Sequence, residues 1–274
     1  MITHGTHVHM VRLRGKKKLY QSAFPQKNFY DNDPEQVSRY VYALKFVKNK
    51  IVLDVACGRG YGTYFISKKS KAMVGVDIRK DYIEFARNNY SSNNLQFLES
   101  DATKINLSDN TFDVIISFET IEHLQDADSF LREVIRLLKD DGILLLSTPN
   151  RDLNPQDHSK PTNELHVKEY TEMELRESLS RFFSRVEIMG QNPKSVNIAL
   201  VQDYLRKYNY WNSIPPALRK LFPNALKNRL IKTLRFRRGP YSNFSWDNVV
   251  IEKFDPNLSF TLVALCKEPR KESY

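Results

Sequence analysis

Apolar positions along this chain change their period repeatedly between residues 34 and 190, and each change predicts an element. Short runs rich in apolar, β-branched and aromatic residues, such as 112–118, predict buried strands, and apolar residues three and four apart, as in 127–138, predict amphipathic helices. The predicted strands are 51–56, 72–77, 95–98, 112–118, 143–147, 183–189 and 259–266, and the predicted helices are 34–47, 61–69, 80–89, 127–138 and 172–179. Because helices separate the strands, we expect a mostly parallel sheet that is covered on both faces.

Three segments fall outside this alternation. Residues 1–30 show no period, and we expect a flexible basic segment there, whose histidines His4, His7 and His9 do not form a metal site. A polar stretch at 150–167 predicts a loop over the active site. Residues 191–256 mix aromatic, proline and basic residues, which predicts an insertion before the last strand. The main domain is then 31–190 plus 257–268.

Positive charge is concentrated in two of these segments. The chain carries a net charge of +10, of which residues 201–240 contribute +9 and residues 1–30 contribute +6, leaving about −5 for the rest. Leucines and phenylalanine four apart alternate with basic residues in 215–238, and Pro223 predicts a division into two short helices. Such a segment fits a cover with its charge in solvent, contact with an anionic membrane surface, or nucleic-acid binding.

Composition limits the class of protein. No run approaches the roughly 18 apolar residues of a membrane-spanning helix, and the start of the chain lacks an apolar signal core. We therefore expect a cytoplasmic protein that could contact the membrane peripherally through 215–238. The two cysteines, Cys57 and Cys266, are too few for a disulfide framework and are expected to be unpaired.

The stretch VLDVACGRGYG, residues 52–62, carries the first sign of chemistry. An apolar strand ends at Asp54, and Gly58, Gly60 and Gly62 then allow a tight turn with close approach of backbone to a ligand. The third glycine comes one residue too early for the G-x-G-x-x-G dinucleotide motif. Asp54 suits a group that holds the loop or receives a cationic amine.

Two further acids follow the next two predicted strands. Asp77 ends VGVD, where a carboxylate can accept both hydroxyls of a ribose, and Asp101 follows FLES, where it can accept from an adenine amino group beside the Ala102 backbone. Either acid alone is also common in turns and helix caps. Their joint placement beside one glycine loop favours a nucleoside-containing ligand.

The motifs VLDVACGRGYGT, VGVDIRKDYIEFAR, FLESDATKINLSDNTFDVIISFETIEHL and LLKDDGILLLSTPN resemble, in order and spacing, those of class I S-adenosylmethionine-dependent methyltransferases. The resemblance covers about residues 35–190. It implies a Rossmann-like seven-stranded sheet whose last strand is antiparallel, with the cofactor across the carboxyl ends of the strands. It also implies roles by position: Asp54, Gly58, Gly60 and Gly62 around the methionine end, Asp77 at the ribose, Asp101 and Ala102 at the adenine, and Phe118 near the sulfonium. Arg39 and Tyr40 match a position that contacts the cofactor carboxylate in relatives, although Arg39 also fits a surface charge.

A second constellation begins directly after the strand at 112–118. Glu119, Glu122 and His123 form an E-x-x-E-H motif, and His166 follows in NELHVKEYT. Two carboxylates and two imidazoles can bind a divalent metal ion, which would lower the pKa of a substrate hydroxyl. This arrangement resembles metal-using small-RNA ribose 2′-O-methyltransferases and the E-x-x-E-H of ubiquinone-pathway O-methyltransferases. Without a metal, His123 or His166 is a candidate general base or a hydrogen-bonded loop histidine.

These features favour an S-adenosylmethionine-dependent O-methyltransferase acting on a small molecule or on a sugar of a glycan, including a lipid-linked one. Residues 150–240 are loosely similar to methyltransferases of cell-surface polysaccharide pathways. The alternatives are an RNA ribose methyltransferase and a non-catalytic cofactor-binding regulator. Against the RNA hypothesis, no recognised RNA-binding module is visible. The sequence does not predict the oligomeric state.

Overall fold

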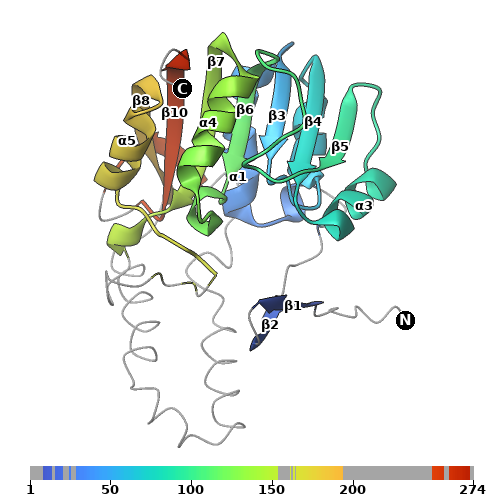
Figure 1. Ribbon diagram of the computed structural model, residues 1–274, viewed down its shortest axis with the longest axis horizontal. Coiled ribbons are helices and arrows are strands. Elements are labelled where there is room, and N and C mark those ends of the chain that lie inside the picture. Colours follow the sequence, from blue (N-terminus) through green and yellow to red (C-terminus); the bar gives the residue numbers. More distant parts are fainter. Residues whose placement is uncertain are drawn as a thin grey trace, which may run out of the picture.

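A mostly parallel sheet organises the structure, a computed structural model that describes residues 9–13, 16–20, 25, 29–153, 161, 163, 165–193, 249–255 and 259–271. Within these residues, eight strands pair in the order β5-β4-β3-β6-β7-β10-β8-β9 (Figure 1). They are β3 (Ile51–Val55), β4 (Ala72–Asp77), β5 (Leu95–Glu99), β6 (Phe112–Phe118), β7 (Leu138–Pro149), β8 (Phe183–Pro193), β9 (Val249–Lys253) and β10 (Thr261–Pro269). β3 to β7 are parallel, and β10 is antiparallel to both β7 and β8. The predicted fold class is confirmed.

The helices lie where the apolar period predicted them. They are α1 (Pro34–Val47), α2 (Tyr61–Ser67), α3 (Lys80–Asn89), α4 (Ala127–Leu137) and α5 (Glu172–Ser180). Asp33 caps α1 by accepting hydrogen bonds from the backbone of Glu35 and Gln36, at 3.0 and 3.1 Å. Thr171 and Glu174 form a capping box at the start of α5. Local capping chemistry therefore sets where these two helices begin.

Two apolar clusters cover the two faces of the sheet. Successive side chains of a strand point to opposite faces, so Leu144 and Leu146 of β7 pack with α4 and α5, whereas Leu145 packs with α1. All three leucines are fully buried. Figure 1 shows α4 and α5 in front of the sheet and α1 behind it. With both faces covered, the carboxyl ends of the parallel strands remain as the place for a ligand.

The structure departs from the sequence prediction in three places. β9, inside the predicted insertion 191–256, pairs antiparallel with β8 and adds an eighth strand. The predicted flexible segment 1–30 contains an antiparallel pair, β1 (His9–Leu13) and β2 (Lys16–Tyr20), and a short 3-10 helix, η1 (Phe29–Asp31). The predicted connection between the helix 127–138 and the strand 143–147 is instead part of β7, whose pairing with β6 shifts register between Phe112 and Val114. A bulge in one strand accommodates those extra residues without ending the strand.

The basic segment lies outside this description. The predicted helices of 215–238 and the split at Pro223 fall in 194–248, beyond the described residues. Residues 154–160, 162 and 164 of the predicted loop 150–167 also lie outside the described residues. None of the helices in the described part of the chain has the length and hydropathy needed to cross a bilayer.

Candidate functional site

The predicted site residues follow strands that lie side by side. β4, β3 and β6 are neighbouring parallel strands, so their carboxyl ends lie at one edge of the sheet. Asp77 and Phe118 are the last residues of β4 and β6, and Asp54 is the penultimate residue of β3. Ligands of open α/β sheets bind at such an edge. The fold thus brings the glycine loop and the E-x-x-E-H motif to the same edge.

Asp54 is a buried carboxylate with one oxygen left free. Its Oδ2 accepts hydrogen bonds from Thr63 Oγ1 at 2.7 Å and from the Tyr40 hydroxyl at 3.1 Å. Its Oδ1 has no hydrogen-bond partner among the described residues. Burial raises the pKa of Asp54 to about 7. Because an unpartnered buried polar atom is costly, a cationic ligand group beside Oδ1 would stabilise the site. The arrangement fits the predicted contact with an amine.

The three glycines of the loop have different reasons to be glycine. A Cβ on Gly60 would lie 2.6 Å from the Phe97 ring, and a Cβ on Gly62 would lie 2.1 Å from the Tyr40 ring, so packing requires both. Gly58 has φ +57°, and a Cβ there would meet no described atom within 4 Å. The need for glycine at position 58 therefore comes from its left-handed backbone and from the open space beside it, and not from packing. Of the three, Gly58 is the one that borders room for a ligand.

Asp77 holds the glycine loop as well as ending β4. Its two carboxylate oxygens accept hydrogen bonds from the backbone N–H groups of Gly58 and Arg79, each at 2.9 Å. Burial raises the pKa of Asp77, although these two amides lower it. Each oxygen retains a further lone pair. The geometry is compatible with the predicted ribose contact while showing a structural role that the sequence did not suggest.

Asp101 lies one strand further along the edge and is exposed. It accepts hydrogen bonds from the backbone and hydroxyl of Thr103, at 2.8 and 2.7 Å, which is the turn-forming behaviour expected of an isolated aspartate. Ala102 packs against the core beside it. Ile78, which the sequence reasoning missed, is a large apolar side chain that is 65% exposed directly after Asp77. The sequence could have indicated it, because an apolar residue in a loop beside a predicted nucleoside site suits the face of a base.

Arg39 on α1 is buried, not on the surface. It is 2% exposed, and its NH1 group donates to Gln191 Oε1 at 2.7 Å. Glu119 Oε1 lies 3.7 Å from the same nitrogen, and Arg39 Nε has no hydrogen-bond partner among the described residues. Burial lowers the pKa of Arg39, but the nearby Glu119 and Glu35 more than offset this and raise it. A charged guanidinium with unused donors suits an anionic ligand group.

Glu119 faces this arginine and not the other acids and histidines of its motif. Its backbone has φ 54°, which is uncommon for a non-glycine residue and often found at functional sites. Its Oε1 accepts a hydrogen bond from Ser147 Oγ at 2.8 Å. Just before it, the half-buried Phe118 ring packs edge-on against Tyr40 with centroids 5.3 Å apart. The end of β6 therefore contacts Tyr40, which also contacts Asp54.

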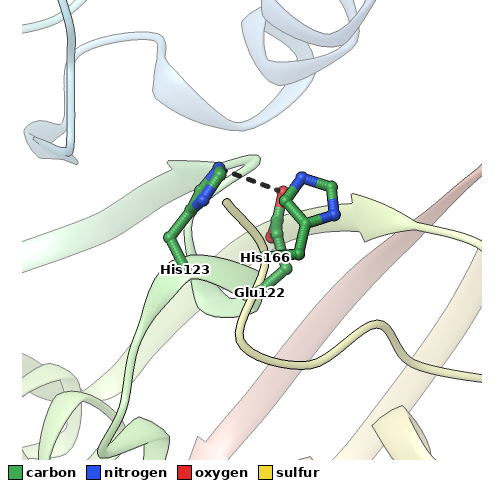
Figure 2. Close-up of side chains that lie close together, drawn as sticks. All are labelled: Glu122, His123 and His166. Atoms are coloured by element: carbon green, nitrogen blue, oxygen red, sulfur yellow. Dashed lines mark ion pairs between the residues drawn. The ribbon is translucent and has the colours of Figure 1, made fainter. Parts of the chain in front are cut away.

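Glu122, His123 and His166 form a second group (Figure 2). Each offers one ligand atom within 4.8 Å of the others, and Glu119 is not part of the group. Glu122 is fully buried in η2 (Ile121–His123); its Oε2 accepts from Thr148 Oγ1 at 3.0 Å, whereas Oε1 has no hydrogen-bond partner among the described residues. Figure 2 marks the 4.0 Å approach of His123 Nε2 to that oxygen. The cluster thus contains three of the four predicted ligands.

Hydrogen bonds fix the tautomers of both imidazoles. His123 Nδ1 lies 3.2 Å from the Leu165 carbonyl, and His166 Nδ1 lies 2.7 Å from Glu169 Oε1. Since a carbonyl and a carboxylate only accept, each Nδ1 carries the proton and each Nε2 carries a lone pair. His166 Nε2 faces the side-chain amide of Asn163 at 3.1 Å. His123 Nε2 is therefore set up to accept a proton or bind a cation, whereas His166 Nε2 already accepts from the Asn163 amide and can bind a cation only in place of that amide.

The charge states of this group follow from burial. Burial lowers the pKa of His123, so its imidazole is neutral near pH 7. Burial and then the neighbouring Glu119 raise the pKa of Glu122 to about 8, so its carboxyl is largely protonated at that pH. Ligands about 2.1 Å from one metal ion lie no more than about 4.2 Å apart, so the group needs a small side-chain movement to bind one. The donor set and its supporting acceptors, the Leu165 carbonyl and Glu169, fit a cation.

Gln191 and Glu169 are the polar residues that sequence reasoning missed. Gln191 contacts Arg39 across 152 positions of sequence, and no local sequence pattern predicts such a pair. Glu169 is 3% exposed and lies three residues after His166. An acid at that spacing after a candidate histidine is a signal that could have been used.

Comparison with known proteins places the chain among enzymes. A family model described as a methyltransferase domain matches residues 46–198. The chain belongs to this family. The match includes the glycine loop, the E-x-x-E-H motif and His166, and it confirms the resemblance found in the sequence.

Named relatives of this methyltransferase domain differ in what they methylate. A protein of Mycobacterium tuberculosis named as a probable S-adenosylmethionine-dependent methyltransferase is 32% identical over 124 residues, which are 45% of this chain and 44% of that protein. A ubiquinone biosynthesis O-methyltransferase of Pelagibacter ubique is 36% identical over 110 residues, 40% of this chain and 46% of that protein. Other relatives are named as N-methyltransferases of phosphoethanolamine and of ajmaline.

A solved structure from Thermotoga maritima, described as a SAM-dependent methyltransferase, shares the fold of this chain. Its TM-score is 0.57 at 14% identity, over 86% of this chain and 91% of that one. The matches to the two curated relatives above span less than half of those proteins' length. Family and fold are therefore shared, and the acceptor has to be argued from the site.

Proposed function

We propose that this chain is an S-adenosylmethionine-dependent methyltransferase whose acceptor binds beside Glu122, His123 and His166. S-adenosylmethionine supplies an electrophilic methyl group on a sulfonium and ends in an ammonium and a carboxylate. Unpartnered Oδ1 of the buried Asp54 is the observation that carries the proposal. Arg39 also supports the proposal: its buried Nε has no hydrogen-bond partner among the described residues, and its positive charge suits the carboxylate of the cofactor.

The other cofactor contacts are proposed from their places at the same edge. Gly58 leaves open space beside the loop, Asp77 accepts from the ribose, and Ile78 covers a face of the adenine. Asp101 and Ala102 lie at the adenine end, with Gly60 and Gly62 serving chiefly to pack the loop. Phe118, at the end of β6 directly before Glu119 and packed on Tyr40, is the residue proposed to lie near the sulfonium.

The acceptor side suits proton removal from a hydroxyl. His123 is neutral near pH 7 and carries its lone pair on Nε2, so it can take the proton of an acceptor as the new bond to carbon forms. His166 is oriented in the same way by Glu169. Holding the nucleophile in line with the methyl group supplies most of the remaining rate enhancement. We therefore infer O-methylation of a small molecule or of a sugar hydroxyl in a glycan, lipid-linked or free.

A divalent metal ion is the alternative to a histidine base, because His123 Nε2 cannot bind a metal ion and take a proton with the same lone pair. Glu122, His123 and His166 would hold it, and it would lower the pKa of the acceptor hydroxyl. The same donor set favours an RNA ribose 2′-O-methyltransferase as the alternative function. Binding experiments distinguish the two functions. Salt-sensitive RNA binding supports the RNA methyltransferase, whereas binding of anionic lipid vesicles through 215–238 supports a lipid-linked acceptor.

The proposal is tested by binding first and by transfer afterwards. Calorimetry with S-adenosylmethionine and its demethylated product should show saturable binding that Asp54→Asn weakens. Transfer of a labelled methyl group is then screened against nucleotide sugars, lipid-linked sugars, small phenols and small RNAs. Binding without transfer to any hydroxyl or amine would favour a non-catalytic regulator, and no binding of either ligand would refute the proposal.

A further inference from the structure

Gln191 on β8, the strand next to the β9 edge of the sheet, connects that part of the sheet to α1 through its side chain. Its side chain is 2% exposed, and its backbone pairs with Thr261 of β10 and Ile251 of β9. Oε1 accepts from Arg39 NH1 at 2.7 Å, and Nε2 donates to the Glu35 carbonyl at 2.8 Å and to Ser38 Oγ at 2.7 Å. The amide therefore makes three hydrogen bonds to one turn of α1.

The orientation of this amide is determined by its partners. Ser38 Oγ donates its own proton to the Glu35 carbonyl at 2.9 Å, so toward Gln191 it can only accept. Arg39 can only donate. A flipped amide would place Nε2 against the guanidinium and Oε1 against two acceptors. Gln191 thus offers one fixed oxygen to Arg39.

Arg39 has few other constraints among the described residues. Glu119 lies 3.7 Å from its NH1, longer than a good charge-assisted hydrogen bond, and Nε is unpartnered. Long, flexible side chains lose considerable rotamer entropy when a ligand fixes them. A neutral acceptor can hold the guanidinium in place without cancelling its charge. A close carboxylate would cancel that charge.

We propose that Gln191 is a positioning residue that holds the Arg39 guanidinium ready for the carboxylate of the cofactor. This inference rests on the proposed function and adds a specific residue from outside the methyltransferase motifs. Loss of Gln191 weakens only the part of the cofactor affinity that depends on the carboxylate.

The experiment compares two ligands on the full-length chain: S-adenosylmethionine and its decarboxylated analogue, which lacks only the carboxylate. Gln191→Met keeps side-chain length and removes the hydrogen bonds. It should weaken binding of S-adenosylmethionine about tenfold, because a hydrogen bond to a charged group is involved. Binding of the analogue should change by less than about twofold. In an Arg39→Met background, Gln191→Met should have no further effect on S-adenosylmethionine.

Asn192→Leu is the matched control. Asn192 is the next residue of β8, is 5% exposed, and contacts Glu252 at 3.5 Å. This variant should leave the ratio of the two affinities unchanged. If Gln191→Met does not fold, Gln191→Glu replaces it; the added carboxylate competes with the ligand for Arg39 and should also lower the ratio.

The outcomes separate this inference from the proposed function. Equal weakening of both ligands, or no weakening of either, would show that Gln191 serves only the fold or has no role. A wild-type chain that binds neither ligand would overturn the proposed function and this inference together.

Discussion

Replacing Asp54 by asparagine should make the protein more stable at neutral pH while it loses its cofactor. Asp54 is a buried acid that ionises only near pH 7 in the folded chain. The unfolded chain ionises it near its ordinary pKa of 3.8. Between these values the unfolded state releases the proton first, so the wild-type protein loses stability as pH rises from about 4 to about 7. The asparagine variant has no proton to release there.

The size of the effect follows from those two values. A difference of about three pKa units at about 1.4 kcal/mol each gives a ceiling of about 4 kcal/mol at pH 8. In the variant, the asparagine oxygen can still accept from Thr63 and Tyr40, but its NH2 group replaces the unpartnered Oδ1 and costs about 1–3 kcal/mol. The variant should therefore gain about 1–3 kcal/mol at pH 8 and be less stable than wild type at pH 4.

Denaturant unfolding at pH 4, 6 and 8, with and without S-adenosylmethionine, measures both parts. The two curves of unfolding free energy against pH should cross. The affinity for S-adenosylmethionine, obtained from the stabilisation that the ligand causes, should be at least about tenfold lower for the variant than for wild type. Asp113→Asn is the control: partial burial raises the pKa of Asp113, but Lys139 and the backbone N–H of Ile51 together lower it by more, so its contribution to stability is lost as pH falls. An Asp54→Asn variant that is less stable at every pH, or that binds the cofactor normally, would refute the reasoning.

Three further results are expected from the same site. Gly62→Ala should cost about 1–3 kcal/mol of stability because its Cβ meets a tyrosine ring at 2.1 Å, whereas Gly58→Ala should cost about 1 kcal/mol and chiefly weaken cofactor binding; equal losses of stability in thermal melts would contradict this. His123→Asn should lower kcat about 10²–10⁴-fold with an unchanged cofactor Kd, and an unaltered kcat would exclude it as the base. Glu122→Gln and His166→Ala should each abolish stimulation by divalent cations, and wild-type activity that a chelator leaves intact would rule out the metal ion.

The fold was predictable because each buried strand and helix has a clear local period. β3, β4 and β6 are mostly apolar, and Asp33 and Thr171 mark helix starts by local capping chemistry. β9 has five residues after a long stretch without period, and it is recognisable as a strand only from its pairing with β8. Tertiary pairing, which local sequence does not encode, creates that element.

The placement of the candidate site residues was predictable where they sit in one motif and unpredictable where it depends on contacts across the fold. Asp54 and Asp77 followed from their places at strand ends, and His166 from the loop that contains it. Glu119, although adjacent in sequence to the other ligand candidates, turns to Ser147 and Arg39 because its backbone takes a left-handed conformation. A φ of this kind at a glutamate cannot be read from the residue type.

Under the proposed function, the charges of Asp54 and Arg39 favour one class of ligand. Native proteins leave few buried polar atoms without partners, yet an acidic Oδ1 at Asp54 and a basic Nε at Arg39 both lack one among the described residues. A ligand ending only in phosphates would satisfy Arg39 and be repelled by Asp54. An α-amino acid terminus carries an ammonium and a carboxylate on one carbon, and so satisfies both. In the proposed function, this pairing of opposite charges, more than the glycine loop, favours S-adenosylmethionine over the dinucleotides that similar folds bind.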